Sequence, residues 1–319
     1  VHTCPAGAKK VRNDLARAKN LLARNPKVIA SLAPSIVSEW PDVPPQAMAG
    51  AIKQPGFHAV SETALGAEAV THALSERLRV ARPGLHISTA CPVVVDHIRK
   101  YQPEFTAHLT PMLSPMQTHA QLLKQHYGDD IAIVFFGPCI AKKCECDELP
   151  GYTDIALTFK DLFQWLEEEQ IHPEQAPASR FKPAQAAHGA LYPVVGGMNR
   201  TLENYNLSNL ELISVSGLET LFQTLKNLDP VALTEPVFLE ALACPGGCIG
   251  GPQTTCSKPI LTSELAVRKQ VRAHTPGTVP AKVVSHTFIP LPQQNNTHSD
   301  AQVHEALRRV GKEKAEDEL

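Results

Sequence analysis

The sequence has no hydrophobic run that approaches the about 20 consecutive apolar residues of a membrane-crossing helix, and its N-terminus lacks the pattern of a signal peptide. Net charge is also nearly absent, at −2 for 319 residues. Nothing in this composition indicates a polyanion such as nucleic acid as a partner. We therefore expect a cytoplasmic protein that binds neither membranes nor nucleic acid.

Histidine pairs with the spacing of metal ligands, such as H-x-x-x-H, are missing among the 14 histidines, and we assign no histidine to a metal. The eight cysteines remain as the candidate ligands. A chain of this length can bury a sizeable core and does not need disulfides to fold. Metal binding in a reducing compartment is therefore the better interpretation of the cysteines.

The stretch 240–253, EALACPGGCIGGPQ, combines Cys244 and Cys248 with four glycines. The apolar run 237–243 predicts a buried strand, and the glycines let the following backbone turn sharply and approach a bulky group. Buried structural cysteines are the alternative, but they would not require Pro-Gly-Gly between them. A zinc or iron–sulfur site is therefore favoured.

Two more predicted strands end close to a cysteine: residues 85–89 precede Cys91, and residues 130–136 precede Cys139. Ligands bind at the carboxyl ends of the strands in parallel α/β sheets. Together with the cysteine pair described above, four thiolates converging there could hold a cubane iron–sulfur cluster. Structural zinc cysteines usually come as two close pairs, so the isolation of these two cysteines disfavours zinc.

The predicted fold is α/β, because strand-like runs alternate with helical patterns along the chain. We expect two lobes of mostly parallel sheet flanked by helices, with the metal cluster in the cleft between them. Residues 26–101 and 237–275 are expected to form one lobe, and residues 102–236 the other. Trp40 and Trp165 are expected in the core.

Three segments resemble the signature motifs of a known family. They are Ser88-Thr-Ala-Cys-Pro92, Gly137-Pro-Cys-Ile-Ala-Lys-Lys-Cys-Glu145 and Glu240-Ala-Leu-Ala-Cys-Pro-Gly-Gly-Cys248. Their order and the Pro-Cys-x-x-Lys-x-x-Glu pattern are similar to those of the [FeFe]-hydrogenase large-subunit domain. The resemblance covers most of the chain before residue 256.

The resemblance implies an H-cluster, in which a [4Fe-4S] cubane is joined through one cysteine to a two-iron subcluster with CO, cyanide and a dithiolate bridge. It assigns Cys91, Cys139, Cys244 and Cys248 to the cubane, and makes Cys248 the bridge to the two-iron centre. The implied partners are H₂ and protons, together with a redox partner that is reached through neighbouring iron–sulfur modules.

Four further site residues follow from the same resemblance. Lys142 is expected to donate a hydrogen bond to an iron-bound cyanide and Glu145 to pair with this lysine, while Pro34 and Ser35 are expected to face the two-iron centre. An anionic cyanide in a dry pocket needs a donor, and a buried ammonium needs a carboxylate. The alternative for Lys142 and Glu145 is a solvated i,i+3 pair on a helix.

The sequence departs from the catalytic members of this family along their proton path. Those members carry Thr-Ser-Cys-Cys-Pro, in which the first cysteine shuttles protons, whereas this sequence has Ala90 there. Val70 and Ala73 stand where the path has acidic residues, and Thr110 keeps a hydroxyl at a serine position. Loss of a positioned proton carrier typically costs about 10²–10⁴ in rate.

Other departures lie around the expected two-iron centre. Gly137 and Leu242 replace two methionines that touch this centre in the family, and the glycine run after Cys248 ends early, at Pro252. The whole set resembles the sensory branch of the family, in which iron–sulfur and PAS modules follow. A sensor tolerates slow turnover better than a fuel-handling enzyme does.

The two ends of the chain are expected to connect to other modules. Residues 1–25 are interpreted as the tail of a ferredoxin-like region and a connecting helix, because Cys4-Pro5 resembles the end of a ferredoxin repeat. The chain begins with Val, so we expect a cut from a longer protein. Residues 26–275 would form the H-cluster domain, and residues 276–319 a linker and a charged helix towards a missing C-terminal module.

The leading prediction is an iron-only hydrogenase-type oxidoreductase domain that reacts reversibly but slowly with H₂ and serves H₂ sensing and redox signalling. One alternative is a fully catalytic, ferredoxin-linked [FeFe]-hydrogenase with another proton route. A second is a non-catalytic iron–sulfur protein of the cluster-assembly type, against which the residues expected at the two-iron centre argue. Cys144, Cys146 and Cys256 are expected to be exposed or half-buried thiols.

Overall fold

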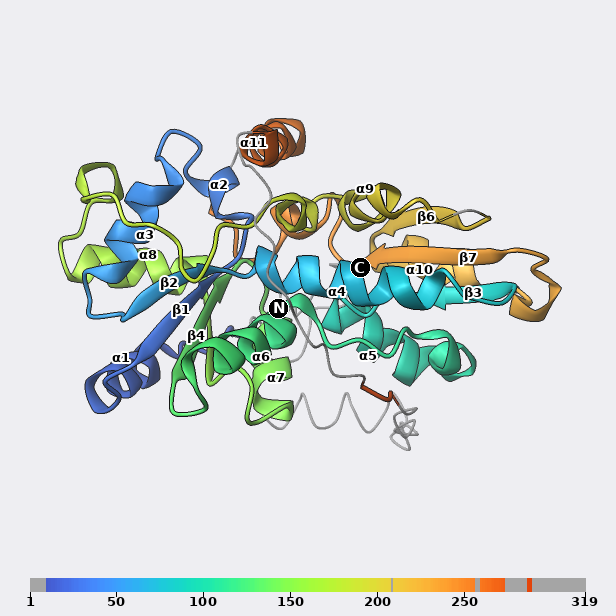
Figure 1. Ribbon diagram of the computed structural model, residues 1–319, viewed down its shortest axis with the longest axis horizontal. Coiled ribbons are helices and arrows are strands. Elements are labelled where there is room, and N and C mark those ends of the chain that lie inside the picture. The colour runs from blue at the N-terminus through green and yellow to red at the C-terminus, as the bar shows by residue number, and fades with distance from the viewer. Residues whose placement is uncertain (1–9, 208, 256–258, 273–285, 289–319) are drawn as a thin grey trace, which may run out of the picture.

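The computed structural model describes residues 10–207, 209–255, 259–272 and 286–288 (Figure 1). Cys4, Cys256 and the predicted charged helix at the end of the chain lie outside these residues, as does most of the predicted linker. The ferredoxin-like tail and the C-terminal module therefore stay predictions.

Four parallel strands form the first sheet, in the order β2-β1-β4-β5. Their bounds are Val28–Leu32 for β1, Ala59–Glu62 for β2, Ala132–Gly137 for β4 and Ile155–Thr158 for β5. Every residue of the two inner strands is buried, as is typical of parallel sheets covered by helices on both faces. The register places Ser31 of β1 beside Ser61 of β2.

Three parallel strands form the second sheet, in the order β3-β7-β6. Their bounds are Gly84–Ile87 for β3, Glu211–Ser216 for β6 and Pro236–Leu242 for β7. The central strand β7 is buried from Phe238 onwards, whereas alternate residues of the edge strand β6 are exposed. The predicted α/β class with two parallel sheets flanked by helices is confirmed.

The predicted division into lobes was wrong. Residues 26–101 and 237–275 were expected together, but β3 and β7 pair with β6, while β1 and β2 pair with β4 and β5. The alternation of strands and helices predicts parallel strands without specifying which of them are neighbours. Here β4 inserts between β1 and β5 because its fully apolar sequence requires an inner position.

Eleven α-helices connect and cover the strands in the described ranges. They are α1 (Leu15–Arg24), α2 (Ile36–Glu39), α3 (Pro45–Lys53), α4 (Ala64–Leu78), α5 (Pro92–Tyr101), α6 (Pro115–Tyr127), α7 (Ala141–Glu148), α8 (Phe159–Glu168), α9 (Gly197–Leu202), α10 (Leu218–Leu225) and α11 (Ile260–Arg272). Of these, α2, α7 and α11 were not predicted. None of the described helices has both the length and the apolar character that crossing a membrane requires.

Helix α4, in the middle of Figure 1, connects the two halves of the molecule. It leaves β2 of the first sheet, and its apolar side packs with Phe238 of the second sheet in one buried cluster. On another side it packs against α6, where a Cβ atom on Gly66 would lie 2.2 Å from the carbonyl oxygen of Pro115. Glycine is therefore required at this crossing. The helix fixes the distance between the sheets and thus the space at their carboxyl ends.

The two tryptophans lie at the core of the first sheet, as expected. Trp165 on α8 is buried, and Trp40 is half-buried and packs edge-on against Phe163. Helix α8 begins with a capping box, in which Thr158 and Asp161 each accept a hydrogen bond from the other's backbone N–H. This cap holds the buried face of α8 on the sheet.

Candidate functional site

The carboxyl ends of both sheets open onto one cavity of about 100 Å³. The first sheet supplies the segments after β1 and β4, and the second sheet supplies those after β3 and β7. The lining residues from these segments are Ala33, Pro34, Ser35, Pro138, Cys139, Ala90, Cys91, Pro92, Leu242 and Cys248. A largely apolar cavity with a few convergent polar groups is the usual form of a ligand site.

Three of the four predicted cluster cysteines line this cavity, and the fourth lies close to them. Cys91, Cys139 and Cys248 are in the cavity wall. Cys244 interacts electrostatically with each of Cys139 and Cys248, as does Cys91. Four thiols from three separate segments therefore meet at one place.

Two of these thiols stand at helix N-termini, where the helix dipole favours negative charge. Cys91 directly precedes α5, and Cys139 lies two residues before α7. The backbone N–H of Lys142 also donates a hydrogen bond to the Cys139 sulfur. Both features stabilise a thiolate or an anionic group bound through it.

Burial acts in the opposite direction on three of the four thiols. It raises the pKa of Cys139 to about 12 and that of Cys244 to about 11, and it raises the pKa of Cys248 well above the ordinary value. Negative charge on Cys91 adds to each of these shifts. Four thiolates so close together require a cationic group among them, which is the condition that bound iron fulfils.

The turn that carries Cys244 and Cys248 depends on its glycines. Gly246 and Gly247 both have positive φ angles, of 77° and 86°, and a Cβ atom on Gly247 would lie 2.5 Å from the carbonyl oxygen of Pro193. The backbone N–H of Gly247 closes the turn on the Cys244 carbonyl at 2.9 Å. The Pro-Gly-Gly sequence predicted such a turn, and the close approach to Pro193 is the reason for it.

Lys142 and Glu145 face each other on α7 beside the cavity. Lys142 Nζ donates to Glu145 Oε2 at 2.6 Å, and the side chains are only 11% and 10% exposed. The pair is thus not a solvated one on the helix surface. Glu145 accepts one of the three N–H donors of the ammonium group, and Lys142 lines the cavity, so a further donor can reach a bound acceptor.

Ser35 offers a second unused polar group to the cavity. Its side chain is 1% exposed and its Oγ atom has no hydrogen-bond partner in the structure. A buried hydroxyl without a partner is costly unless a ligand completes its hydrogen bonding. Pro34 lines the cavity next to it.

These residues fit an H-cluster, to judge from the chemistry of the donors. Four thiols can hold the cubane, and Lys142 and Ser35 can donate to anionic ligands of a two-iron centre in the adjoining apolar cavity. Within the described ranges, no three or more His, Cys, Asp or Glu side chains are arranged to hold a single metal ion.

None of the residues expected at the positions of the family's proton path carries an acidic group. Ala90 lines the cavity beside Cys91, while Val70 is buried in an apolar cluster and Ala73 packs against that cluster. Thr110 bonds to the Thr89 hydroxyl at 3.3 Å. None of these side chains titrates near neutral pH.

The two positions at which family methionines were expected to be replaced differ in their surroundings. Leu242 lines the cavity. Gly137 is not among the lining residues, and a Cβ atom there would lie 2.5 Å from the Phe135 ring, which is itself in the cavity wall. Phe135 therefore occupies the space next to Gly137.

Sequence analysis missed seven residues that line the cavity. They are Thr63, Ala67, Pro115, Met116, Phe135, Tyr192 and Pro193. They come from the connection before α4, from α4 itself, from the start of α6, from β4 and from the segment before α9. No motif marks them, and only the packing of these elements brings them to the cavity.

The remaining cysteines of the described chain lie away from the cavity. Cys144 is exposed, as expected. Cys146 is buried, contrary to the expectation of an exposed or half-buried thiol, and its Sγ donates to the Thr153 carbonyl at 3.0 Å. It faces inward because α7 turns this residue towards the first sheet.

The chain belongs to the iron-only hydrogenase family. The family described as iron only hydrogenase large subunit, C-terminal domain, matches residues 26–252. The NADP-reducing hydrogenase subunit HndD of Solidesulfovibrio fructosivorans is 24% identical over 318 aligned residues, which cover 79% of this chain and 54% of that protein. The chain thus spans about half the length of this relative.

Solved structures share the fold. The [FeFe]-hydrogenase HydA1 from Chlamydomonas reinhardtii superposes with a TM-score of 0.61 at 16% identity, over 80% of this chain and 88% of that chain. A structure of HydA(ΔEFG), described as revealing stepwise H-cluster assembly, gives the same score, identity and coverage. At this level of identity the likeness establishes the fold, and the site rests on the residues of this chain.

Proposed function

We propose that this domain binds an H-cluster and reacts reversibly but slowly with H₂, as the sensing element of a redox signalling protein. Cys91, Cys139, Cys244 and Cys248 would hold the cubane, with Cys248 as the bridge to the two-iron subcluster. The bound group would supply the chemistry that interconverts H₂ with protons and electrons. The chain's own residues would bind and orient this group and exclude water from it.

The protein's part is to bind, orient and exclude water. Lys142 would donate to an anionic ligand at the cavity wall, and Glu145 holds the ammonium group in place at 2.6 Å. Ser35 would donate its unpartnered hydroxyl from the opposite segment. The apolar remainder of the wall, such as Phe135 and Leu242, keeps the dielectric low and strengthens these contacts.

Ala90 is the observation that carries the proposal of slow turnover. It occupies the cavity wall next to the ligand position Cys91, where catalytic relatives have a thiol. A methyl group cannot pass a proton, and a missing carrier costs about 10²–10⁴ in rate, which is about 3–5 kcal/mol of barrier. A sensor needs only to equilibrate with H₂ and change its redox state.

The proposal extends to the partners of the domain. Electrons would pass through neighbouring iron–sulfur modules, and a PAS or other signalling module would receive the output. Residues 26–275 would be the H-cluster domain within a longer cytoplasmic protein, where the cluster thiols stay reduced. A ferredoxin-like region would precede residue 26, and a linker and helix would follow residue 275.

A second candidate is a fully catalytic, ferredoxin-linked hydrogenase. One observation favours it: a chain of buried side chains joins Thr63, in the cavity wall, to the imidazole of His119. Such a chain could replace the missing thiol as a proton route. The non-catalytic cluster-assembly type is disfavoured, since it would not require Lys142 or Ser35 at an apolar cavity.

Infrared spectroscopy combined with turnover tests this function. Protein matured anaerobically should show the CO and cyanide bands of a two-iron centre, and these bands should change on exposure to H₂. H₂ evolution with a reduced dye, per loaded centre, should be about 10²–10⁴ below that of ordinary hydrogenases. Absence of the bands after maturation would refute the H-cluster, and ordinary rates would refute the sensor in favour of the catalytic candidate.

A further inference from the structure

A buried histidine with hydroxyl groups on both ring nitrogens lies beneath the first sheet. His119 on α6 is 0% exposed. Its Nδ1 atom lies 2.8 Å from Ser31 Oγ, and its Nε2 atom lies 2.9 Å from Ser61 Oγ. Ser31 Oγ in turn lies 2.8 Å from Thr63 Oγ1. The four side chains therefore form one continuous line of hydrogen bonds.

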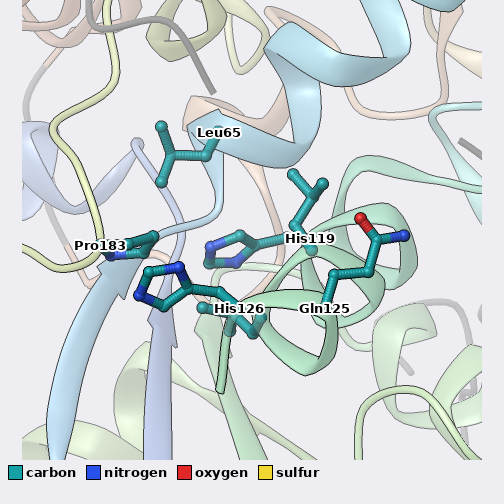
Figure 2. Close-up of a pocket in the computed structure, with 7 residues that line it drawn as sticks. Leu65, His119, Gln125, His126 and Pro183 are labelled. Carbon is teal, nitrogen blue, oxygen red and sulfur yellow. The ribbon is translucent and has the colours of Figure 1, made fainter. Parts of the chain in front are cut away.

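This line meets a hollow of the molecule at two of its members, Thr63 and His119. Thr63 lines the cavity that is bounded by the candidate cluster cysteines. His119 lines a separate recess of about 180 Å³, which also borders Leu65, Gln125, His126 and Pro183 (Figure 2). A recess of this size has room for several water molecules. Gln125 and His126 are exposed at its rim, so the recess reaches bulk solvent.

We propose that the side chains of His119, Ser31 and Thr63 relay protons between this recess and the cavity, and sustain the slow turnover that remains without a thiol at position 90. This proposal rests on the proposed function, because the relay would supply protons to the proposed H-cluster site. It differs in location from the path that sequence analysis found interrupted at Val70 and Ala73, which lies on α4.

The relay balances without leaving charge on the chain. On inward transfer His119 accepts a proton at Nε2 from water of the recess, which regains one from bulk solvent, and releases its Nδ1 proton to Ser31 Oγ. Ser31 passes its own hydroxyl proton to Thr63, and Thr63 passes its hydroxyl proton to an acceptor in the cavity. Each hydroxyl gains one O–H bond and loses one, and the imidazole changes only its tautomer.

The environment keeps the imidazole neutral, which such a relay requires. Burial lowers the pKa of His119 to about 3, so at neutral pH one ring nitrogen donates and the other accepts. A hydroxyl group can both donate and accept a hydrogen bond, so the line of side chains can pass protons in either direction. A carboxylate in place of either serine would instead fix the imidazole in one charged state.

The positions of the serines indicate more than packing. Ser31 and Ser61 are neighbours in the register of β1 and β2. Ser31 lies within the otherwise apolar and buried β1, and Ser61 is buried after two apolar residues of β2. A core histidine needs only one partner per nitrogen, and Thr63 is not such a partner. Its hydrogen bond extends the line beyond the histidine to the cavity.

Histidine NMR tests the relay without any cofactor. In the full chain purified without iron, ¹⁵N-labelled His119 is assigned by comparison with His119→Gln. Exchange between tautomers should give both ring nitrogens ¹⁵N chemical shifts that lie between the values of a protonated and an unprotonated nitrogen. Ser31→Ala should remove this averaging and leave one tautomer. A single fixed tautomer in the wild type would overturn the relay and assign His119 a structural role.

Turnover of the loaded protein provides the second measurement. Ser31→Ala and Thr63→Val should each lower H₂ evolution per loaded centre at least about tenfold, and should change the solvent deuterium isotope effect. The control is Thr118→Val, because Thr118 is also buried on α6 but bonds only to the Leu113 carbonyl, at 3.4 Å. Thermal unfolding verifies that each variant folds.

The outcomes separate this inference from the proposed function. Infrared bands that are unchanged in Ser31→Ala, together with a wild-type rate and isotope effect, would overturn the relay and leave the H-cluster assignment intact. A wild type that never shows the bands would refute the proposed function, and the NMR result would still decide whether the line of side chains exchanges its protons.

Discussion

Lys142 Nζ lies 2.6 Å from Glu145 Oε2, while the neighbouring Lys143 points to the other side of α7 and binds Asp14 and Asp161 at 3.2 and 2.8 Å. Both lysines are largely buried. Only Lys142 lines the cavity. Of these two adjacent lysines, Lys142 is therefore the candidate for a role at the site, and Lys143 has a structural role.

Lys142→Asn should alter the site without unfolding the protein. The amide keeps a donor but removes the charge, so contact with an anionic ligand weakens. We expect four-iron loading to persist and the cyanide bands to shift or weaken in the infrared spectrum. Identical spectra of the variant and the wild type would mean that Lys142 does not contact the two-iron centre.

Lys143→Asn provides the matched control at the next position. Removing one partner of a buried ion pair typically costs about 3–5 kcal/mol, because Asp161 loses its cation, whereas Asp14 keeps Arg12 and Arg17. The free energy of unfolding, measured with denaturant, should fall by this order, whereas the infrared bands of the folded fraction should not move. A band shift in this variant would show that α7 transmits strain to the site.

Substitution of the cluster cysteines by serine should abolish or reduce cubane loading. Cys139→Ser is the most direct test, since this half-buried thiol lines the cavity and lies close to Cys91 and Cys244. Iron counts and the absorbance of the cluster measure the effect. Cys144→Ser is the control because Cys144 is exposed and is not among the residues that line the cavity. Unchanged four-iron loading in Cys139→Ser would contradict the assignment.

The cysteine positions were predictable because local rules govern them. An apolar run that ends in a cysteine predicts a strand with a thiol at its carboxyl end, and parallel strands place such ends on one edge. Sequence pattern alone was therefore sufficient to locate Cys91 and Cys139. The Pro-Gly-Gly turn added Cys244 and Cys248, since its glycines tolerate positive φ angles.

Other features could not be predicted because they depend on long-range packing. The position of β4 between β1 and β5 depends on pairing between strands that are far apart in the chain. The buried residues of α7 are Lys142, Lys143 and Cys146, so its inward face is mostly charged. Its sequence therefore lacks the helical spacing of apolar residues from which a helix is predicted. The single signal for the relay was the presence of Ser31 within the otherwise apolar strand β1.

Glu62 should make the protein less stable as the pH rises from about 5 to 7. Burial raises its pKa to about 7 from an ordinary 4.5, although the Ala186 N–H donates to it at 2.8 Å. The folded state therefore holds a proton that the unfolded state releases. This stabilisation is complete below pH 4.5 and is lost as the pH rises through 7, at up to about 1.4 kcal/mol per pH unit.

Glu62→Gln isolates this contribution. The amide keeps an acceptor for Ala186 and never ionises, so the variant should match the wild type near pH 4.5 and exceed its free energy of unfolding by up to about 3 kcal/mol at pH 8. Denaturant titrations across this range measure the difference. Asp129→Asn, at an exposed position, should leave the pH dependence unchanged. Parallel curves for Glu62→Gln and the wild type would show that Glu62 is ionised in the folded protein.

Ala90→Cys should accelerate H₂ evolution, because it restores a proton carrier next to Cys91 in the cavity wall. The gain should fall short of the about 10²–10⁴ of a complete carrier, since Val70 and Ala73 leave the outer part of that path apolar. Rates with a reduced dye are compared at equal two-iron loading, as established by infrared spectroscopy. Ala67→Cys is the control, because it places a thiol elsewhere on the same wall and should not raise the rate. An equal gain from both thiols would mean that proton delivery at position 90 does not limit turnover.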